Sequence, residues 1–344
     1  MTLVFALLLL LLGSLVSYSL LSFLLRQNSS ILVPDTPNSR SLHSQVVPKG
    51  GGLVIIISTV SLIGIYQAIY QSIAVMHVLI ALLVGCIAVL GWIDDRHNLR
   101  IRTRIIMQIV IACAMVYLLA RLQGINIAGY HLELPDWLLF VSIVVWVVWM
   151  TNLFNFMDGI DGLVSTQSTI ATVVLACWFY QEDAPNLVLL NMTLAGALVG
   201  FSFHNWRPAS VFLGDIGSLT LGIYFAVMGI IGWTVYRLPV EAFMLLYGVM
   251  FCDATVTLMV RILRRERWWE AHSSHFYQRL VRLGYNHAQV TSLAVMVTVC
   301  LSIYATLLIH ERAPQWLWIL LGGLTLTGCG LIIKHKEKKH LNLK

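Results

Sequence analysis

The chain has 344 residues, of which 58% are hydrophobic and only 11% carry a charge, and its formal net charge is +6. So apolar a composition excludes an ordinary soluble domain and indicates a chain made mostly of helices in a lipid bilayer. The positive charge calls for no nucleic-acid partner, because basic residues gather in the cytoplasmic loops of membrane proteins. We therefore predict an all-α integral membrane protein.

About eleven segments are apolar enough to cross ~30 Å of hydrocarbon, which takes roughly 20 residues of helix. In chain order they lie near 3–25, 51–70, 74–93, 104–120, 136–154, 163–181, 186–203, 217–236, 239–262, 289–310 and 314–333. We expect the first to be a retained helix and not a cleaved signal peptide, since no basic residue precedes Arg26. One membrane domain is predicted over 1–333, followed by a basic cytoplasmic tail over 334–344.

The orientation follows from Lys and Arg, which stay on the cytoplasmic side when loops are short. If the N-terminus is periplasmic, all of the 22 basic residues except Arg121, Arg237 and Arg312 fall in cytoplasmic loops or in the tail. This arrangement makes the C-terminus cytoplasmic. It also places the polar breaks after the third and fifth spans, and before the eighth, on the cytoplasmic face.

Those three breaks carry acidic residues in a chain that has few. The five acids are Asp94, Asp95, Asp158, Asp161 and Asp215. Ionisable residues among membrane spans are by default a functional-site hypothesis. For the Asp158–Gly159 pair alone, a simple turn explains the sequence equally well. Three clusters on one face favour a site.

Carboxylates gathered on one membrane face predict a hard cation. Mg²⁺ prefers oxygen ligands and is usually held by one or two carboxylates together with substrate phosphates. Asp158 and Asp161 share a face if their segment is helical, and Gly159 and Gly162 favour a bend that lets a ligand approach. The acids outnumber the needs of one ion, which leaves some for substrate contacts or proton handling.

Two longer cytoplasmic loops add basic and polar residues to the same face. The first contains Arg40 and His43 and then a run of glycines after Pro48. Arg40 can pair a phosphate bidentately, and glycines let backbone N–H groups approach one. The loop after the ninth span holds His272-Ser-Ser-His275 among Arg and Trp residues. These histidines can bind zinc, but without a carboxylate at matching spacing we expect them to contact phosphate or to hydrogen-bond within the loop.

These segments together resemble the polyprenyl-phosphate N-acetylhexosamine-1-phosphate transferases of glycosyltransferase family 4. The segment from Asn155 to Leu163 is similar to the family signature N-x-x-D-G-x-D-G-L, the Asp94-Asp95 pair to its double aspartate, and Phe212 to Ser218 to its F-x-G-D-x-G-S loop. Arg40, His43, Pro48 and the glycines resemble its first cytoplasmic loop, and Asp253 resembles a buried aspartate of its ninth helix.

Two features separate the chain from the peptidoglycan branch of that family. The histidine motif is His272-Ser-Ser-His275 and not a run of adjacent histidines. Val46 and Val47 precede Pro48, where the peptidoglycan enzyme has a lysine. Both features favour the branch that initiates O-antigen or other surface polysaccharides.

The resemblance implies transfer of a sugar 1-phosphate from a UDP-N-acetylsugar to undecaprenyl phosphate, giving a diphosphate-linked lipid sugar and UMP. It implies a multi-pass protein of the bacterial inner membrane, surrounded by membrane lipids, that uses Mg²⁺ or Mn²⁺, allows a homodimer and binds no nucleic acid. The implied catalytic residues and metal ligands are Asp215, Asp94 and Asp95. The implied substrate contacts are Asn155, Asp158, Asp161 and Asn205 in the nucleotide pocket, Phe212 stacked on uracil, His272 and His275 at the diphosphate or sugar, and Arg40 and His43.

The sequence leaves two alternatives open. A phosphate monoester has a second pKa near 6, so the lipid phosphate is largely dianionic at pH 7 and a metal is worth more than a base. This favours direct in-line attack over a covalent intermediate on Asp94. An ion-coupled transporter is the other functional class, but transporters place coupling residues near the bilayer midplane. Only Asp253 fits that position, roughly 12 Å inside along a straight ninth helix.

Overall fold

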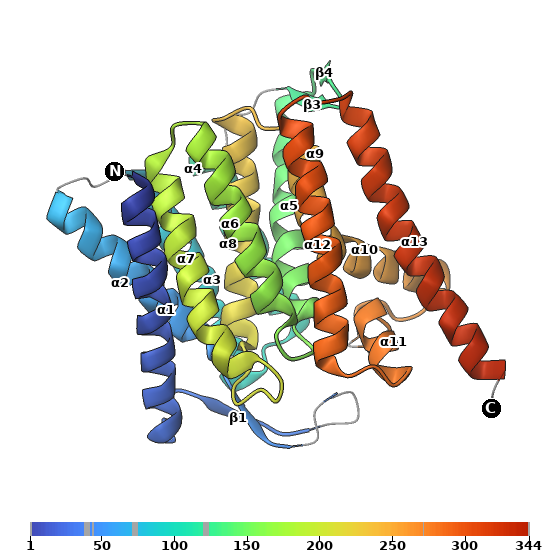
Figure 1. The fold of residues 1–344 in the computed structure, drawn as a ribbon, viewed down its shortest axis with the longest axis horizontal. Coiled ribbons are helices and arrows are strands. Elements are labelled where there is room, and N and C mark those ends of the chain that lie inside the picture. Colours follow the sequence, from blue (N-terminus) through green and yellow to red (C-terminus); the bar gives the residue numbers. More distant parts are fainter. Residues whose placement is uncertain are drawn as a thin grey trace.

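The computed structural model describes residues 2–37, 42, 45–70, 75–119, 124–270 and 272–342. Figure 1 shows a helical bundle with a small two-stranded sheet at each end. In chain order the elements are α1 (Thr2–Arg26), β1 (Val33–Asp35), β2 (Val47–Lys49), α2 (Gly52–Tyr70), α3 (Val75–His97), α4 (Ile101–Leu119), β3 (Ile125–Ile127), β4 (Tyr130–Leu132), α5 (Asp136–Met157), α6 (Leu163–Gln181), α7 (Pro185–Asn205), α8 (Gly214–Thr234), α9 (Val240–Leu246), α10 (Gly248–Leu263), α11 (Phe276–Arg282), α12 (His287–Ile309) and α13 (Gln315–Asn342).

The described residues contain 10 helices long and apolar enough to cross a membrane, and the bent pair of α9 and α10 makes a possible eleventh. This confirms the predicted all-α membrane fold. The straight helix expected over 239–262 is wrong, because α9 and α10 meet at 85°. Gly248 stands at the break, where an added Cβ would lie 2.9 Å from Leu301. Asp253 therefore lies on a helix that turns across the bundle, and its predicted depth does not hold.

Helix α8 forms the centre of the bundle and is almost wholly buried. On the outside, α1 packs along α7 (Figure 1) through small residues. A Cβ added to Gly196 or Gly200 of α7 would overlap the backbone of α1. Small residues let membrane helices approach closely and gain dispersion contacts. The first apolar segment is therefore an integral part of the bundle.

The two ends of the bundle differ in what they carry. At one end α3 and α5 finish and α8 begins, and the antiparallel β1–β2 hairpin pairs Val33 with Lys49. We call this the carboxylate end. At the other end the β3–β4 hairpin is held to α9, where the Ala128 N–H donates to Glu241. The N- and C-termini lie toward opposite ends (Figure 1). That the carboxylate end faces the cytoplasm stays a prediction from the basic residues.

Two further sequence predictions concern the first loop and the C-terminal basic segment. Arg40 and His43 lie outside the described residues. The basic segment that begins at Lys334 shows no break from the membrane domain, because α13 continues through it to Asn342.

Candidate active site

Asp95 holds the beginning of α8 in place. Its carboxylate accepts hydrogen bonds from the N–H groups of Asp215 at 3.1 Å and Ile216 at 3.0 Å. An acid at this position satisfies N–H groups that lack a partner within the helix and suits the helix dipole. Lys49 Nζ lies 3.2 Å from the same carboxylate. Burial alone would lower the pKa of Lys49, but Asp95 and Asp215 raise it above its usual value, so the lysine stays charged.

Glycines allow α2, α3 and α8 to meet at this point. A Cβ on Gly52 would overlap Gly217, and one on Gly91 would lie 2.6 Å from the backbone of Asp215. The N–H groups of Gly51 and Gly52 donate to the carbonyls of Phe212 and Leu213, at 3.0 and 2.9 Å. Because these two amides are used within the protein, they do not offer the expected approach to a phosphate. The glycine run serves helix packing.

Asp215 and Asp158 form a pair of acids at the start of α8. Asn155 Nδ2 donates to Asp215 Oδ1 at 2.6 Å and to the Ser218 hydroxyl at 3.0 Å, which fixes the Asp215 side chain. Asp158, the first residue after α5, accepts a hydrogen bond from the Gly214 N–H. Burial, together with the negative charges of Asp215 and Asp95, raises the pKa of Asp158 to about 8. An acid whose ionisation is disfavoured by neighbouring carboxylates lies at a site where a cation is stabilising.

Asp94 is engaged with the loop after α3 and with α4. Its Oδ1 accepts from the Leu99 N–H at 2.7 Å, and Arg104 donates to its Oδ2 at 3.0 Å. The Nε of Arg104 is buried and has no partner among the described residues. In the sequence, Arg104 and Lys49 served only to predict the membrane orientation. In the structure, each neutralises one member of the double aspartate. Their spacing to the aspartates gave no signal, because helix packing creates both contacts.

Asp161 ties the loop after α5 to two other segments. Its Oδ1 lies 3.2 Å from His287 Nδ1, at the start of α12, and its Oδ2 accepts from the Ala209 N–H at 3.4 Å. Burial would raise the pKa of Asp161, but His287, the Ala209 N–H and Arg207 outweigh it, so the pKa is below its usual value. His287 was not singled out from the sequence, where a lone histidine before an apolar span carries no signal.

Asn205 joins the same segments from α7. Its Oδ1 accepts from the Gly162 N–H and the Ser165 hydroxyl, both at 3.1 Å, and its Nδ2 donates to the Val211 carbonyl at 2.9 Å. Asn205 is 5% exposed. Phe212 is half-buried, and its backbone pairs with the β2 segment at Lys49. Nucleotide contacts by these residues stay a prediction.

Asp253 places the histidine motif. Its carboxylate accepts from the N–H groups of Phe276 at 2.9 Å and Tyr277 at 3.1 Å, at the start of α11, and lies 3.1 Å from His275 Nδ1. The rings of His272 and His275 are 4.9 Å apart. Burial, His275 and Arg261 lower the pKa of His272 to about 4, so His272 is neutral at pH 7. The buried aspartate expected in the ninth helix is thus a support for the histidine loop.

The histidine loop reaches the acid pair through Tyr277. The Tyr277 hydroxyl donates to the Phe156 carbonyl at 3.0 Å, two residues before Asp158. A Cβ on Gly159 would overlap that hydroxyl, which explains the glycine at this position. The structure thus gathers Asp94, Asp95, Asn155, Asp158, Asp161, Asn205, Phe212, Asp215, His272 and His275 at the carboxylate end.

Within the described ranges, no three His, Cys, Asp or Glu side chains come together as a ready metal cluster. Mg²⁺ requires less, because it binds through one or two carboxylates and completes its shell with water and substrate phosphates. Asp158 and Asp215 fit that requirement, since both offer carboxylate oxygens and the charge of Asp215 acts on Asp158.

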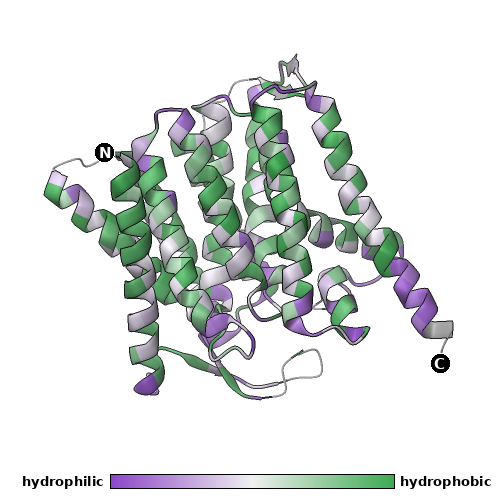
Figure 2. Cartoon of the chain, viewed as in Figure 1, coloured by the Kyte–Doolittle hydropathy of each residue, from purple (hydrophilic) through white to green (hydrophobic). Residues whose placement is uncertain are grey.

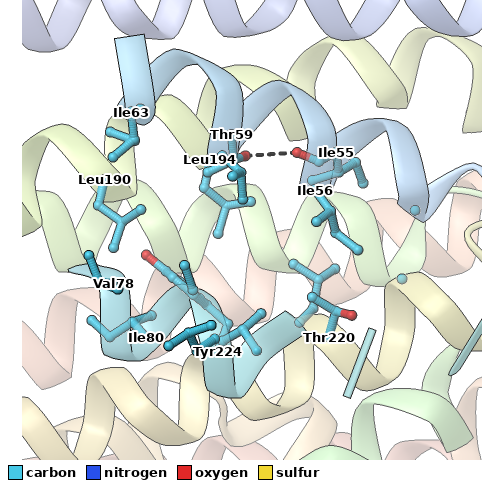
Figure 3. Close-up of a pocket in the computed structure, with 18 of the residues that line it drawn as sticks. Ile55, Ile56, Thr59, Ile63, Val78, Ile80, Leu190, Leu194, Thr220 and Tyr224 are labelled. Carbon is cyan, nitrogen blue, oxygen red and sulfur yellow. Dashed lines mark hydrogen bonds between the residues drawn. The ribbon is translucent and has the colours of Figure 1, made fainter. Parts of the chain in front are cut away.

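An apolar cavity of about 320 Å³ lies beside the site, between α2, α3, α7 and α8 (Figure 3). Ile55, Ile63, Leu190 and Leu194 are among its lining residues. The polar groups that it contains are satisfied internally; the Thr59 hydroxyl, for example, donates to the Ile55 carbonyl at 2.8 Å. None of the described residues that line this cavity is charged. It offers hydrocarbon surface only.

Comparison with known proteins shows which family of enzymes this chain resembles. The model of glycosyl transferase family 4 matches residues 76–233, which include both the double aspartate and Asp215. The probable undecaprenyl-phosphate N-acetylglucosaminyl 1-phosphate transferase of Bacillus subtilis (strain 168) is 25% identical over 289 residues, covering 82% of this chain and 78% of that protein. The family model and these relatives support the polyprenyl-phosphate hexosamine-1-phosphate transferases as the family that this chain resembles.

The peptidoglycan branch of the transferase family also matches. The phospho-N-acetylmuramoyl-pentapeptide-transferase of Wolbachia pipientis wMel is 28% identical over 66% of this chain and 71% of that protein. The enzyme of the same name from Helicobacter hepaticus is 38% identical over 80 residues, or 23% of this chain and 21% of that protein. The relatives and the apolar helices together identify this chain as a multi-pass protein of the bacterial inner membrane. The O-antigen branch stays a prediction.

Proposed function

We propose that this protein transfers a sugar 1-phosphate from a UDP-N-acetylsugar to undecaprenyl phosphate and releases UMP. The observation that carries the proposal is the acid pair of Asp158 and Asp215, held by Asn155 and Gly214 at the start of the central helix. The names of the relatives supply the class of substrate. A polyprenyl chain stays in the bilayer while a nucleotide sugar arrives from water, so the reaction needs a site at a membrane face, and this pair lies at one end of the helical bundle.

Asp158 and Asp215 are the proposed ligands of Mg²⁺, with Mn²⁺ as the alternative. When bound, such an ion offsets negative charge on the two phosphate groups that must meet. Asp95 does not face the ion in this proposal; it fixes the backbone of Asp215, and Lys49 neutralises it. Asp94 likewise holds Arg104, whose guanidinium is the proposed partner for a phosphate oxygen.

The proposed reaction is a direct transfer. An oxygen of the lipid phosphate forms a bond to the phosphorus that carries the sugar, and the bond from that phosphorus to the oxygen of UMP breaks. Because a phosphate monoester is largely dianionic at pH 7, no proton has to be removed before attack. Positioning and charge neutralisation then account for most of the rate, which suits a site of fixed acids and cations.

We further propose that the product initiates an O-antigen or another envelope polysaccharide. The support comes from the histidine motif, in which His272 and His275 are separated by two serines, and from Val46 and Val47 before Pro48. His275 is buried on Asp253, whereas His272 is half-buried and neutral. A neutral imidazole both donates and accepts hydrogen bonds, as recognition of a sugar hydroxyl requires.

The test is a transfer assay with detergent-purified protein, Mg²⁺ and undecaprenyl phosphate. UDP-N-acetylglucosamine, UDP-N-acetylgalactosamine, their 6-deoxy relatives and UDP-N-acetylmuramoyl-pentapeptide are offered separately, and UMP release is measured. We expect release with one of the simple sugars and loss of release in Asp215→Asn. Asp136→Asn, at the opposite end of α5, is the matched control and retains activity. The proposal fails if no donor releases UMP, or if Asp215→Asn is as active as the parent protein.

A further inference from the structure

A second cavity, of about 540 Å³, lies between α10, α11, α12 and α13. Helix α10 lines it with Val249, Val256 and Val260, which share one face of the helix. Another face of α10 packs on α5, where the Trp149 indole N–H donates to the Thr255 hydroxyl at 3.1 Å. The kink between α9 and α10 thus gives α10 one face toward the catalytic core and one face toward this cavity.

The walls of this cavity are of two kinds. Most of the lining is hydrocarbon, from α10, α12 and α13, whereas Arg264, Arg279, Lys334 and Glu337 are the charged residues beyond the buried Asp253. Figure 2 shows α13 changing from hydrophobic to hydrophilic toward its C-terminal end, at the level of α11. The charged residues therefore stand where the apolar part of α13 ends, at the depth of a lipid headgroup.

Two of the cavity's cations have no counter-charge. Arg279 forms a bidentate pair with Glu337, with Nε at 2.7 Å from one carboxylate oxygen. By contrast, the side chains of Arg264 and Lys334 have no hydrogen-bond or ion-pair partner among the described residues, and both residues are exposed. Two nearby arginines are paired: Arg261 of α10 with Glu266 at 2.8 Å, and Arg267 with Glu270 at 3.0 Å. The side chains of Arg264 and Lys334 are therefore available to bind an anion.

We propose that this cavity binds one anionic glycerophospholipid, with its acyl chains against α10, α12 and α13 and its phosphate against Arg264 and Lys334. Hydrocarbon beside unpaired cations is complementary to such a lipid, because basic residues at the headgroup level attract anionic lipids. The described lining of the apolar cavity by α2 contains no charged residue and so offers no comparable place for a headgroup.

The lipid proposed here is not the reacting acceptor. Met157 and Leu163, on either side of the loop that carries Asp158, line the cavity together with the buried Asp253 and Tyr277, but among the described residues neither Asp158 nor Asp215 lines it. A phosphate held by Arg264 and Lys334 is therefore outside the acid pair. The lipid would instead join α10 to α13, and so brace the loop that carries the histidines. This inference does not depend on the transferase activity.

The experiment is native mass spectrometry of the full chain in dodecyl maltoside, titrated with phosphatidylglycerol. We expect one tightly retained lipid. Arg264→Gln and Lys334→Gln should each weaken retention about fivefold, and the double variant about 25-fold, as one surface charge against an anionic lipid predicts. Lys338→Gln with Lys339→Gln removes the same charge from exposed positions that do not line the cavity, and should leave retention unchanged. Phosphatidylcholine with the same chains should bind more weakly.

A second variant tests the cavity itself. A Cβ on Gly330 meets only the Phe276 ring, at 3.9 Å, so Gly330→Leu fills space without moving the backbone. It should abolish retention while the melting temperature in lipid-free detergent stays unchanged. The proposal is overturned if the Lys338/Lys339 variant loses the lipid as much as the Arg264/Lys334 variant, or if Gly330→Leu retains it. It is also overturned if undecaprenyl phosphate displaces phosphatidylglycerol one for one, since the cavity would then hold the carrier.

Discussion

The carboxylate end contains two kinds of acid. Asp161 and Asp253 are braced acids: each is buried, accepts hydrogen bonds from backbone N–H groups, and lies within 3.2 Å of a histidine Nδ1. Asp158 and Asp215 are the open pair: Asp158 accepts a bond from the Gly214 N–H, Asp215 accepts one from the Asn155 side-chain amide, and the charge of Asp215 acts on Asp158. The braced acids already have their partners within the protein. Within the described part of the chain neither Asp158 nor Asp215 forms an ion pair of its own, since Lys49 pairs with Asp95 and Arg104 with Asp94, so a bound cation should change the electrostatics most at this pair.

The largest expected effect is on the open pair. Asp215→Asn keeps the size of the side chain and its place beside Asn155 but removes the charge that the proposed metal needs. We expect UMP release to fall by about a hundredfold or more, as for the loss of one electrostatic contact to a transition state, with an unchanged melting temperature. Asp161→Asn serves as the comparison on the braced side. Equal activity loss in the two variants, with both still folded, would contradict the distinction.

A braced acid should instead be needed for stability. Asp253→Ala leaves His275 and the N–H groups of Phe276 and Tyr277 without their buried partner. Breaking a buried pair in this way costs about 3 kcal/mol. Thermal unfolding in detergent measures the effect, and we expect a clearly lower melting temperature. A melting temperature equal to that of the parent protein would show that α11 does not depend on Asp253.

The pH dependence separates the two kinds of acid in another way. The pKa of Asp158 is raised to about 8, mainly by burial, against a usual value near 3.8. The metal-free folded protein therefore binds this proton more tightly than the unfolded chain does. This contribution to stability is complete below pH 4 and is lost as the pH rises through about 8.

Two measurements can detect this loss of stability with rising pH. Without metal, the melting temperature should fall between pH 6 and pH 9, as expected from the pKa of about 8, and Asp158→Asn should flatten the fall. Mg²⁺ binding requires the ionised carboxylate, so its affinity should rise over the same range, by up to about tenfold per pH unit below the pKa. A melting temperature that is the same at both pH values in the parent protein would rule out the raised pKa.

Much of this fold follows from the sequence, because a helix in lipid must be long and apolar. The spans are visible as hydrophobic runs, and the basic residues between them suggest an orientation. The break at Gly248 is different. The segment from Pro239 to Leu263 is apolar on both sides of the break, so its hydropathy gives no signal of an 85° turn. Packing against Leu301 of α12 requires the glycine there.

The same limit of prediction from sequence applies to the single residues of the site. Clusters of acids at one membrane face could be predicted, since few other charges occur among the spans. Which acids are braced could not, because Lys49, Arg104 and His287 reach them only after distant helices have packed. Asp158 and Asp161 are only three residues apart, but they differ in their partners. Asp158 meets the start of α8, whereas Asp161 meets His287 at the start of α12.

The smallest expected effect lies at the junction between the braced acids and the open pair. Tyr277→Phe removes the hydroxyl that donates to the Phe156 carbonyl and keeps the buried ring beside His275. One hydrogen bond of this type contributes about 1 kcal/mol, so the melting temperature should fall slightly and UMP release should change by less than about threefold. Tyr224→Phe, which loses its bond to Asn191 between α7 and α8, is the matched control away from the junction. A tenfold loss of activity in Tyr277→Phe alone, at equal stability, would show that the histidine loop sets the position of Asp158, and the two kinds of acid would then act as one unit.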